Sequence, residues 1–438
     1  MKHEKYDVVV IGSGVGGMCV ASLLSHAGYK TLVVEQLPQI GGRFSTIEYK
    51  GFKLGTGGTF MPMVGIYKGI FDEVGAEFEL RPAEVVRCRI NGRDFESPVA
   101  ESTLLSELCE NEAEAIRIAT VLRQARSGER PSNQISIHDW LLQYTDNEKV
   151  LAYLEYVCPY AFCISAHEAS AKAYFELPKE VGLGLIPMGF PPHGHITLWE
   201  SLAKIVQGSG GNIRTRCKAE RILVTDGTAS GVLIEQNGKK VQIDAKVVIS
   251  NAGPKNTINL AGSAYFDRDY LREVGNLRPG GFIKIEIASD RPLYDVPHLM
   301  TMQTRRMLDF SVLTLICPEL APPGKHLHVA HSFVDSRRDS CDLNEEVNLL
   351  VQDLRENLPA FSKYGEILHV GCYSGEWPVY HTVPFVGYNG LSEKTPVKNL
   401  YNVSDAVATP GWTGGAASAR SATLVAKDIK KSFKPREA

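Results

Sequence analysis

The chain has 438 residues, of which 44% are apolar and 22% charged, and its 47 basic and 50 acidic side chains leave a net charge of −3. This length accommodates two domains with separate hydrophobic cores. So small a net charge gives no electrostatic reason to expect nucleic acid as a partner.

The nine cysteines are scattered along the chain, with no CxxC or Cys/His pattern of zinc spacing. We therefore predict no metal site. Scattered thiols in a long chain are typical of a reducing compartment, and the first residues show no apolar leader segment. The expected location is the cytoplasm.

A buried strand, a tight turn and a helix are predicted at residues 7–28. The run DVVVIG is β-branched throughout, as in a strand covered on both faces. The spacing G-x-G-x-x-G follows it and opens a helix, whose N-terminus favours a phosphate. The first glycine permits the turn, the second lets the backbone touch a pyrophosphate, and the third allows close helix packing. The candidate phosphate-binding residues are Gly12, Gly14, Val15, Gly16 and Gly17.

A second buried strand, TLVVE, ends in Glu35. A carboxylate at this distance from the glycine turn is placed to accept hydrogen bonds from both ribose hydroxyls. Strand, turn, helix, strand and acid all occur in the order that this motif requires. The sequence therefore predicts that the segment holds the ADP half of a dinucleotide.

The sequence GGR, which includes Gly42 and Arg43, follows the acid closely. Two glycines bring the backbone near the cofactor, and Arg43 offers a planar cation to a phosphate or to the edge of a flavin. A nicotinamide dehydrogenase has no need of this element. It indicates a flavin dinucleotide.

Between these segments and the C-terminus, residues 100–180 are predicted to be mostly helical. The segments GFIKIEIAS, FSVLTLIC, HLHVAHSFV and GEILHVGCYS read as strands. Near the C-terminus, NLYNVSD is predicted to be a strand ending in Asp405, and a glycine-rich turn then leads into a helix at residues 416–429. Asp405 is placed to bind ribityl hydroxyls, and this helix N-terminus to face the flavin carbonyls.

These motifs together resemble the superfamily of FAD-dependent amine oxidases and phytoene desaturases. The resemblance covers most of the chain through GSGVGG, Glu35, GGR and the aspartate and glycines near the C-terminus. It implies FAD and an α/β fold of two domains, a Rossmann-like FAD-binding domain of the glutathione-reductase type and an α+β substrate domain. It further implies FAD contacts from Ala219, Asn251, Gly411, Trp412 and Thr413. Cys372 superficially resembles the flavin-linked cysteine of some amine oxidases, but its spacing to Asp405 fits such a link poorly, so we expect the FAD to be non-covalent.

The same resemblance suggests the catalytic candidates. GFIKIEIASDRPLY is similar to an amine-oxidase strand whose lysine, here Lys284, holds a water molecule beside flavin N5. From the alternation of the strand alone, Lys284 and Glu286 are equally well explained as a surface ion pair. Trp412, Tyr380 and Tyr388 are the further candidates for the substrate side of the flavin.

The domains are expected to be discontinuous. Residues 1–85, 186–262 and 380–438 are predicted to form the FAD-binding domain, and residues 86–185 and 263–379 the substrate domain. Since a single G-x-G-x-x-G has a strand before it and a helix after it, we expect no separate nicotinamide domain, and oxygen, a quinone or another acceptor to take the electrons.

The predicted function is dehydrogenation of an apolar or amphipathic small molecule by hydride transfer to FAD. The segment SNAGP is closer to the desaturases than to the amine oxidases and favours a C–C bond. The alternatives are an amine oxidase acting on a C–N bond, a redox-neutral flavin isomerase, and a non-catalytic escort-type binding protein. A lipid-like substrate would add a peripheral membrane contact, and the oligomeric state is left open.

Overall fold

The computed structural model describes residues 3–176, 187–334, 342–374, 380–382, 385–407 and 412–435. The predicted cofactor residue Gly411 lies outside these ranges, and so does the side chain of Tyr380.

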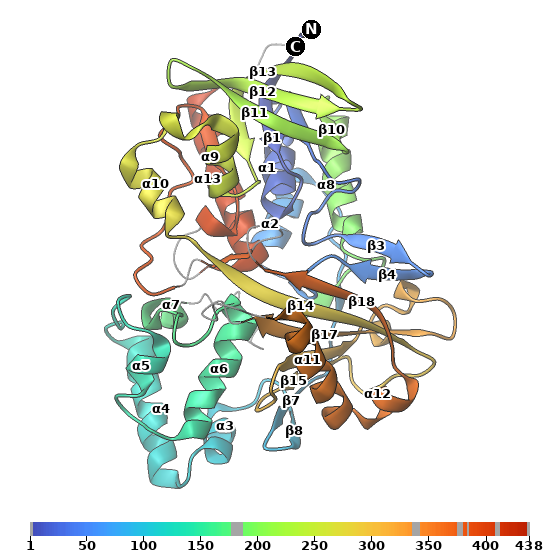
Figure 1. Ribbon diagram of the computed structural model, residues 1–438, viewed down its shortest axis with the longest axis vertical. Helices are drawn as coiled ribbons and strands as arrows, with labels where there is room; N and C mark the ends of the chain where they lie inside the picture. The colour runs from blue at the N-terminus through green and yellow to red at the C-terminus, as the bar shows by residue number, and fades with distance from the viewer. Residues whose placement is uncertain are drawn as a thin grey trace.

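The described residues form a seven-stranded sheet in the upper half of the molecule (Figure 1). Its parallel part pairs β1 with β2 on one side and with β13 on the other, while β12 and β11 continue the sheet in antiparallel fashion. Val8, Val9 and Val10 are fully buried, because both faces of this part are covered. In sheet order the strands are β10 (Asn212–Arg214), β2 (Thr31–Val34), β1 (His3–Ile11), β13 (Lys239–Ser250), β12 (Thr228–Gln236) and β11 (Cys217–Thr225), with β20 (Leu400–Asn402) beside β13.

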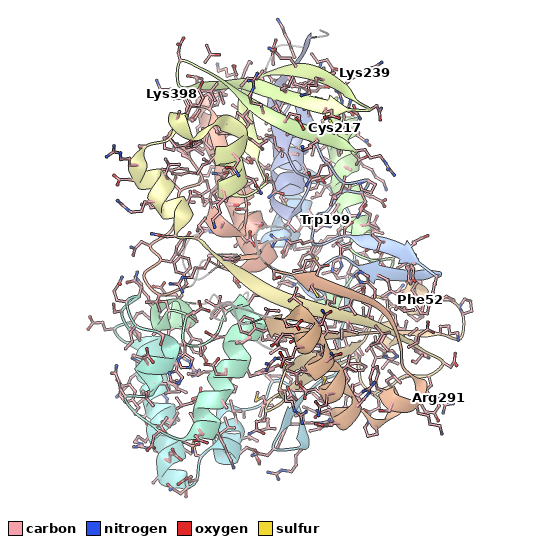
Figure 2. The ribbon with its side chains drawn as sticks, viewed as in Figure 1. Phe52, Trp199, Cys217, Lys239, Arg291 and Lys398 are labelled. Carbon is pink, nitrogen blue, oxygen red and sulfur yellow. The ribbon has the colours of Figure 1, made fainter. Side chains whose placement is uncertain are left out.

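Helices from distant parts of the chain cover this sheet. One face packs against four helices in a single core, in which Trp199 is fully buried (Figure 2). The other face packs against two helices that contribute Ile258 and Val274. The first group comprises α1 (Val15–His26), α2 (Ile66–Val74), α8 (Ile196–Gly208) and α13 (Gly414–Ser432), and the second comprises α9 (Pro254–Ala261) and α10 (Arg268–Gly275).

An eight-stranded sheet forms the lower half (Figure 1). Its order is β18 (Glu366–Tyr373), β14 (Arg278–Ser289), β17 (His326–Val334), β16 (Met307–Val312), β15 (His298–Thr301), β7 (Val86–Ile90) and β8 (Arg93–Glu96), with β19 (Tyr380–Thr382) also beside β14. Ile283, Ile285 and Ile287 of β14 pack with Leu350 and Leu354 in one core. The latter two belong to α11 (Leu343–Asn357), which is followed by α12 (Pro359–Tyr364).

The strand predicted at FSVLTLIC is too long. Strand β16 ends at Val312, and Leu313–Leu315 forms a 3₁₀ turn. The Thr314 hydroxyl bonds His326 Nδ1 at 3.0 Å and accepts from the Leu327 N–H at 3.3 Å. This local pairing ends the strand, although the apolar run continues.

The predicted helical region is confirmed as five helices among the described residues: α3 (Glu101–Leu108), α4 (Glu112–Ser127), α5 (Ile137–Leu141), α6 (Glu148–Phe162) and α7 (Ala171–Glu176). They share a core that includes Trp140, Leu154 and Phe162. Within the described part of the chain, no helix combines the length and the apolar character needed to cross a bilayer.

Short strands complete the structure. The hairpin of β3 (Thr46–Tyr49) and β4 (Phe52–Gly55) follows the GGR segment, and Phe52 (Figure 2) packs in one core with Ala288 and Val329 of the eight-stranded sheet. A small sheet pairs β5 (Met61–Pro62) and β6 (Arg81–Pro82) with β9 (Met188–Phe190). The seven-stranded sheet takes its strands from residues 3–34, 212–250 and 400–402. The exact division into two domains stays a prediction.

Candidate cofactor site

A cavity of about 720 Å³ opens at the carboxyl ends of β1 and β2. This volume falls in the range of about 300–1,000 Å³ that is typical of ligand pockets. Of the residues predicted to bind the cofactor, those on its wall are Gly12, Gly14, Val15, Glu35, Gly42, Arg43, Ala219, Asn251 and Asp405. Segments from both ends of the chain therefore share one cavity.

The glycine turn connects β1 to α1. Gly12 has φ +91°, in the region that favours glycine, and its N–H donates to the Val34 carbonyl oxygen at 2.8 Å. A Cβ at Gly17 would lie 2.1 Å from the Gly12 carbonyl oxygen, so helix and strand meet too closely for any side chain there. Gly14 caps α1 without a side-chain hydrogen bond, and an uncapped helix N-terminus facing a cavity favours an anion.

Gly16 lies behind the cavity wall. A Cβ on it would be 3.0 Å from Asn251 Nδ2. The Asn251 side chain donates to the Val403 carbonyl oxygen at 2.5 Å, and its N–H donates to the Ile11 carbonyl oxygen at 2.7 Å. Asn251 therefore fixes the loops that follow β1, β13 and β20 relative to one another.

Glu35 lies at the end of β2 and is 6% exposed. Its Oε2 accepts from the Ser13 N–H at 2.8 Å and from the Ser13 hydroxyl at 2.7 Å, and its Oε1 accepts from the Leu37 N–H at 2.8 Å. These bonds hold the carboxylate at the cavity wall in one orientation, as the binding of a ribose requires.

Arg43 and Asp405 meet across the cavity wall. Arg43 Nη2 lies 3.2 Å from Asp405 Oδ2, and Asp405 is buried. Asp405 does not end the strand, as the sequence predicted, but begins a short 3₁₀ turn, Asp405–Val407, after β20. Gly42 has φ +58°, and a Cβ on it would lie 3.3 Å from Gly14 Cα, so the two glycine loops are in contact.

The start of α13 forms another part of the wall through Gly414, Gly415 and Ser418. The predicted residues just before it are not on the wall. Thr413 caps the helix and donates to the Ala161 carbonyl oxygen at 3.2 Å, while Trp412 stacks under Arg420 at 5.3 Å.

Sequence reasoning missed Tyr373, which lines the cavity from β18, and Asn256 and Asn259 from α9. The two asparagines follow SNAGP closely along the chain. A helix predicted after that loop would have indicated that they lie near the cofactor. Tyr373 has no such signal, because it reaches the cavity only through the pairing of β18 with β14. Its hydroxyl donates to the Thr56 carbonyl oxygen.

Lys284 and Glu286 form a buried ion pair, so the surface alternative is wrong. Lys284 is 2% exposed and Glu286 is fully buried. Lys284 Nζ lies 3.2 Å from Glu286 Oε1 and donates to the Gly55 carbonyl oxygen at 3.0 Å. The Gly55 N–H donates to the same Glu286 oxygen at 2.7 Å. The pair is therefore anchored to the residue before Thr56, which lines the cavity.

Burial alone would raise the pKa of Glu286. The Lys284 ammonium, the His369 ring and the Gly55 N–H outweigh this effect and hold the pKa below its ordinary value. Glu286 is therefore a carboxylate at neutral pH, and a buried carboxylate needs its partners.

Tyr388 does not line the cavity. Its hydroxyl donates to the Ala406 carbonyl oxygen at 3.2 Å and accepts from the Leu391 N–H at 2.8 Å. Both hydrogen-bonding functions are thus used within the segment that leads to β20. This geometry favours a structural role for Tyr388.

His331 and Asp309 form a hydrogen-bonded pair on the same face of the eight-stranded sheet as Lys284. His331 Nδ1 is 2.7 Å from Asp309 Oδ1, and His331 Nε2 is 2.9 Å from the Thr59 hydroxyl. His331 is directly opposite Lys284 in the pairing of β14 with β17. Burial would raise the pKa of Asp309, but the His331 charge and hydrogen bond lower it overall.

The sequence predicts no metal site, yet three potential ligands meet at the surface of the helical region. The ligand atoms of His138, Asp139 and His167 all lie within 4.8 Å of one another. Asp139 and His167 are exposed. None of the three lines the cofactor cavity, so this cluster is separate from the cofactor site.

A parallel sheet, a glycine turn at a helix N-terminus and a carboxylate after the next strand define a dinucleotide-binding protein. The contact between the two glycine loops and the union of both chain ends at the cavity fit FAD, since an extended dinucleotide needs close backbone approach along its length.

The chain belongs to the family of flavin-containing amine oxidoreductases, whose sequence model matches residues 15–430. An oxidoreductase from Methanosarcina mazei has a similar structure, with a TM-score of 0.85 and 29% identity over 96% of this chain and 100% of that one. A zeta-carotene-forming phytoene desaturase from Myxococcus xanthus is 28% identical over 282 residues, which are 56% of this chain and 53% of that protein. Putrescine oxidase shares the fold, with a TM-score of 0.76 at 16% identity over 98% of this chain and 100% of that one.

These likenesses confirm the predicted family, the FAD-binding two-domain fold and the cofactor. The protein is an FAD-dependent oxidoreductase.

We expect the flavin to be released intact when the protein is precipitated with acid. Cys372, which superficially resembles a flavin-linked cysteine, packs with Val370 in the core on the α11 face of the lower sheet. Its neighbour Tyr373 lines the cavity instead, because alternate residues of a strand point to opposite faces. The measurement is the flavin absorbance of supernatant and pellet. Flavin in the pellet of the wild type but not of Cys372→Ser would contradict non-covalent binding.

Proposed function

We propose that the protein dehydrogenates an apolar or amphipathic small molecule at a C–C bond and passes the electrons to oxygen, a quinone or another acceptor. When bound, FAD supplies the hydride acceptor. The protein residues supply orientation, a dry environment and fixed charge.

The observation that carries this proposal is an aromatic row on the lower sheet, which consists of Tyr373, Phe282 and Phe333. Phe282 of β14 pairs in register with Tyr373 of β18 and with Phe333 of β17. The Phe282 and Tyr373 rings lie 6.4 Å apart, and Tyr373 is on the cavity wall. Contact with an aromatic side chain on the cavity wall stabilises a bound apolar substrate body. The likeness to a phytoene desaturase agrees with it.

The Lys284 ammonium is a fixed charge on the same strand face as Phe282. Lys284 is two residues after Phe282, and Glu286 and the carbonyl oxygen of Gly55, the residue before the wall residue Thr56, hold its ammonium group in place. We infer that Lys284 orients a proton-bearing group, such as water, at the substrate side of the cavity. Because the strand that carries Lys284 is similar to an amine-oxidase strand, an amine oxidase is the second candidate function.

The non-catalytic alternative requires a degraded cofactor site. Gly14, Glu35, Arg43 and Asp405 instead line one cavity, and the family match is to oxidoreductases. This combination supports an enzyme.

Mixing the purified yellow protein with candidate substrates without oxygen tests the proposal. We expect cyclic alkenes or polyenes to bleach the flavin, and primary and secondary amines to leave it oxidised. Bleaching by amines, with hydrogen peroxide released when air is admitted, would identify an amine oxidase instead. Isomerised product without net bleaching would identify the redox-neutral alternative.

A further inference from the structure

Four side chains that can bind a metal ion meet where α5 packs against α6. His138 and Asp139 belong to α5, Glu155 belongs to α6, and His167 lies in the turn that follows α6. None of the four lines the cofactor cavity. We call this group the His138 cluster.

The ligand atoms of the His138 cluster are already close together. One ligand atom from each of His138, Asp139 and His167 lies within 4.8 Å of the other two. His138 Nδ1 is 3.1 Å from Asp139 Oδ1, and the centroids of the two imidazole rings are 3.7 Å apart. A tetrahedral zinc ion at about 2.0–2.2 Å from its ligands spaces them by about 3.3–3.6 Å. Small side-chain rotations would therefore bring the three ligands to the spacing that zinc requires.

Glu155 supplies a carboxylate beside His167. Its Oε1 lies 3.4 Å from His167 Nε2, is buried, and has no hydrogen-bond donor besides that ring within the part of the chain that the structure describes. A histidine that binds a metal ion usually donates its second ring N–H to a carboxylate, which leaves the lone pair of the other nitrogen for the metal. Glu155 is placed for this role at His167.

Backbone hydrogen bonds hold the parts of the cluster in position. The His138 N–H donates to the Ala166 carbonyl oxygen at 3.2 Å, and the Ile137 N–H donates to the Ala169 carbonyl oxygen at 2.8 Å. The Ala166 N–H donates to Glu155 Oε2 at 3.3 Å. Because α5, the turn after α6 and Glu155 are fixed in this way, a metal ion would lose little binding energy to ordering of the chain.

The balance of charge at the cluster also favours a cation. Within the described part of the chain, Asp139 and Glu155 form ion pairs with the two histidines alone, and neither pairs with an arginine or a lysine. A histidine carries a charge only when it is protonated, and as a metal ligand it is neutral. A divalent cation would therefore supply the positive charge that the two carboxylates lack.

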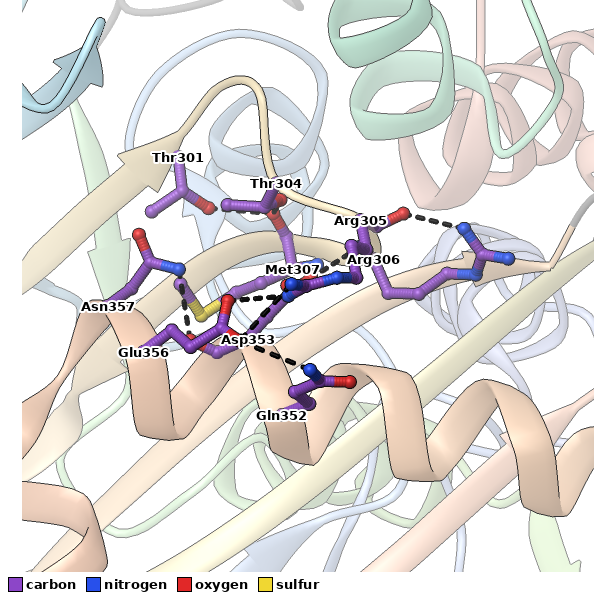
Figure 3. Close-up of polar contacts among 9 residues, drawn as sticks. All are labelled: Thr301, Thr304, Arg305, Arg306, Met307, Gln352, Asp353, Glu356 and Asn357. Carbon is purple, nitrogen blue, oxygen red and sulfur yellow. Dashed lines mark hydrogen bonds and ion pairs between the residues drawn. The ribbon is translucent and has the colours of Figure 1, made fainter.

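The acidic groups around the turn that joins β15 to β16 are different, because arginines already neutralise them (Figure 3). Asp353 of α11 accepts from Arg305 Nη1 at 2.9 Å and from the Arg306 N–H at 2.6 Å, and Glu356 also pairs with Arg305. That group is complete without a ligand, whereas the carboxylates of the His138 cluster are not matched by fixed positive charge.

We propose that the His138 cluster binds one divalent transition-metal cation of the zinc type. The ligands are His138, Asp139 and His167, and Glu155 orients the ring of His167. Imidazole and carboxylate ligands together suit Zn²⁺ and its neighbours in the first transition row, whereas Mg²⁺ and Ca²⁺ prefer oxygen ligands throughout. The cation joins α5 to the turn after α6. This site is independent of the proposed reaction at the flavin.

Calorimetric titration of the flavin-loaded protein with zinc chloride tests the proposal, using protein that carries no histidine tag and has been dialysed against a chelator. We expect one Zn²⁺ to bind per chain. His167→Ala should weaken this binding at least about a hundredfold because it removes a ligand, and Glu155→Gln about tenfold to a hundredfold because it removes the orienting carboxylate. No Zn²⁺ binding by the wild type would overturn the proposal. Equal binding by wild type and His167→Ala would overturn it too, and so would Mg²⁺ binding as tight as that of Zn²⁺.

The matched control is His193→Ala, which removes an exposed histidine from another loop, where its Nδ1 lies 3.2 Å from Lys53 Nζ. This variant should bind Zn²⁺ as the wild type does. Zn²⁺ should raise the melting temperature of both proteins but not that of His167→Ala, because only a chain that binds the ion is stabilised by it. Asp139→Asn keeps the size of an exposed side chain, so it provides the test if His167→Ala fails to fold. It should weaken Zn²⁺ binding at least about tenfold, and unchanged binding in this variant would likewise overturn the proposal.

Discussion

Gly14→Val is expected to yield a folded but colourless protein. A Cβ at Gly14 would lie 2.6 Å from Asn251 Oδ1, and the rest of the valine would occupy the place where the helix N-terminus meets the pyrophosphate. We expect flavin binding to weaken by two orders of magnitude or more, which corresponds to about 3 kcal/mol. The measurement is visible flavin absorbance relative to protein absorbance, after purification and again after reconstitution.

Gly69→Ala is the matched control. Gly69 lies inside α2, and a Cβ there would meet nothing within 4 Å. This variant should keep its flavin and gain about 0.8–1 kcal/mol of stability from the better helix propensity of alanine. A yellow Gly14→Val protein with wild-type affinity would show that the glycine turn does not hold the cofactor.

The second large effect is expected from Glu286→Gln. The substitution removes the carboxylate charge that pairs with Lys284 in the protein interior and leaves the Lys284 ammonium with the Gly55 carbonyl oxygen and a neutral amide oxygen as its closest partners. Breaking one side of a buried ion pair costs about 3–5 kcal/mol. The free energy of unfolding, measured by urea denaturation of the flavin-free protein, should fall by this amount.

An ion pair with the same spacing on a surface strand provides the comparison. Lys218 and Glu220 of β11 lie 2.9 Å apart, with the lysine largely exposed. Glu220→Gln should change stability far less, because solvent screens the charge that remains. The double variant Lys284→Met with Glu286→Gln should recover much of the loss, since it leaves no unpaired buried charge. Equal losses in Glu286→Gln and Glu220→Gln would contradict the buried-pair account.

The half of the cofactor site that binds ADP could be predicted because its determinants are local. Gly12, Gly14 and Glu35 act through one turn and the two strands beside it, so their spacing along the chain reflects their positions in space. Asp405 was predicted from its place between a short apolar strand and a glycine-rich turn, but its exact backbone setting was not, because a strand end and a 3₁₀ turn have similar sequences over a few residues.

The remaining features depend on contacts between distant segments. Whether Lys284 faced solvent or the interior depended on the β3–β4 hairpin covering that face of β14, and strand alternation cannot reveal which face is covered. Tyr373 reaches the cofactor cavity through strand register, and His138 and His167 come together through helix placement set by residues far away in sequence. These placements could be found only once the sheets and helices were assembled.

The cavity draws its walls from residues 11–43 and again from residues 404–418, and Tyr29 donates to the Phe433 carbonyl oxygen at 2.6 Å. A ribosome adds about 5–20 residues per second, so the nascent chain carries an incomplete nucleotide site for most of its synthesis. FAD can bind to the complete site only after helix α13 has been synthesised. Because ligand binding stabilises only a chain that can bind, products truncated before that helix lack this protection and are the ones most exposed to proteolysis.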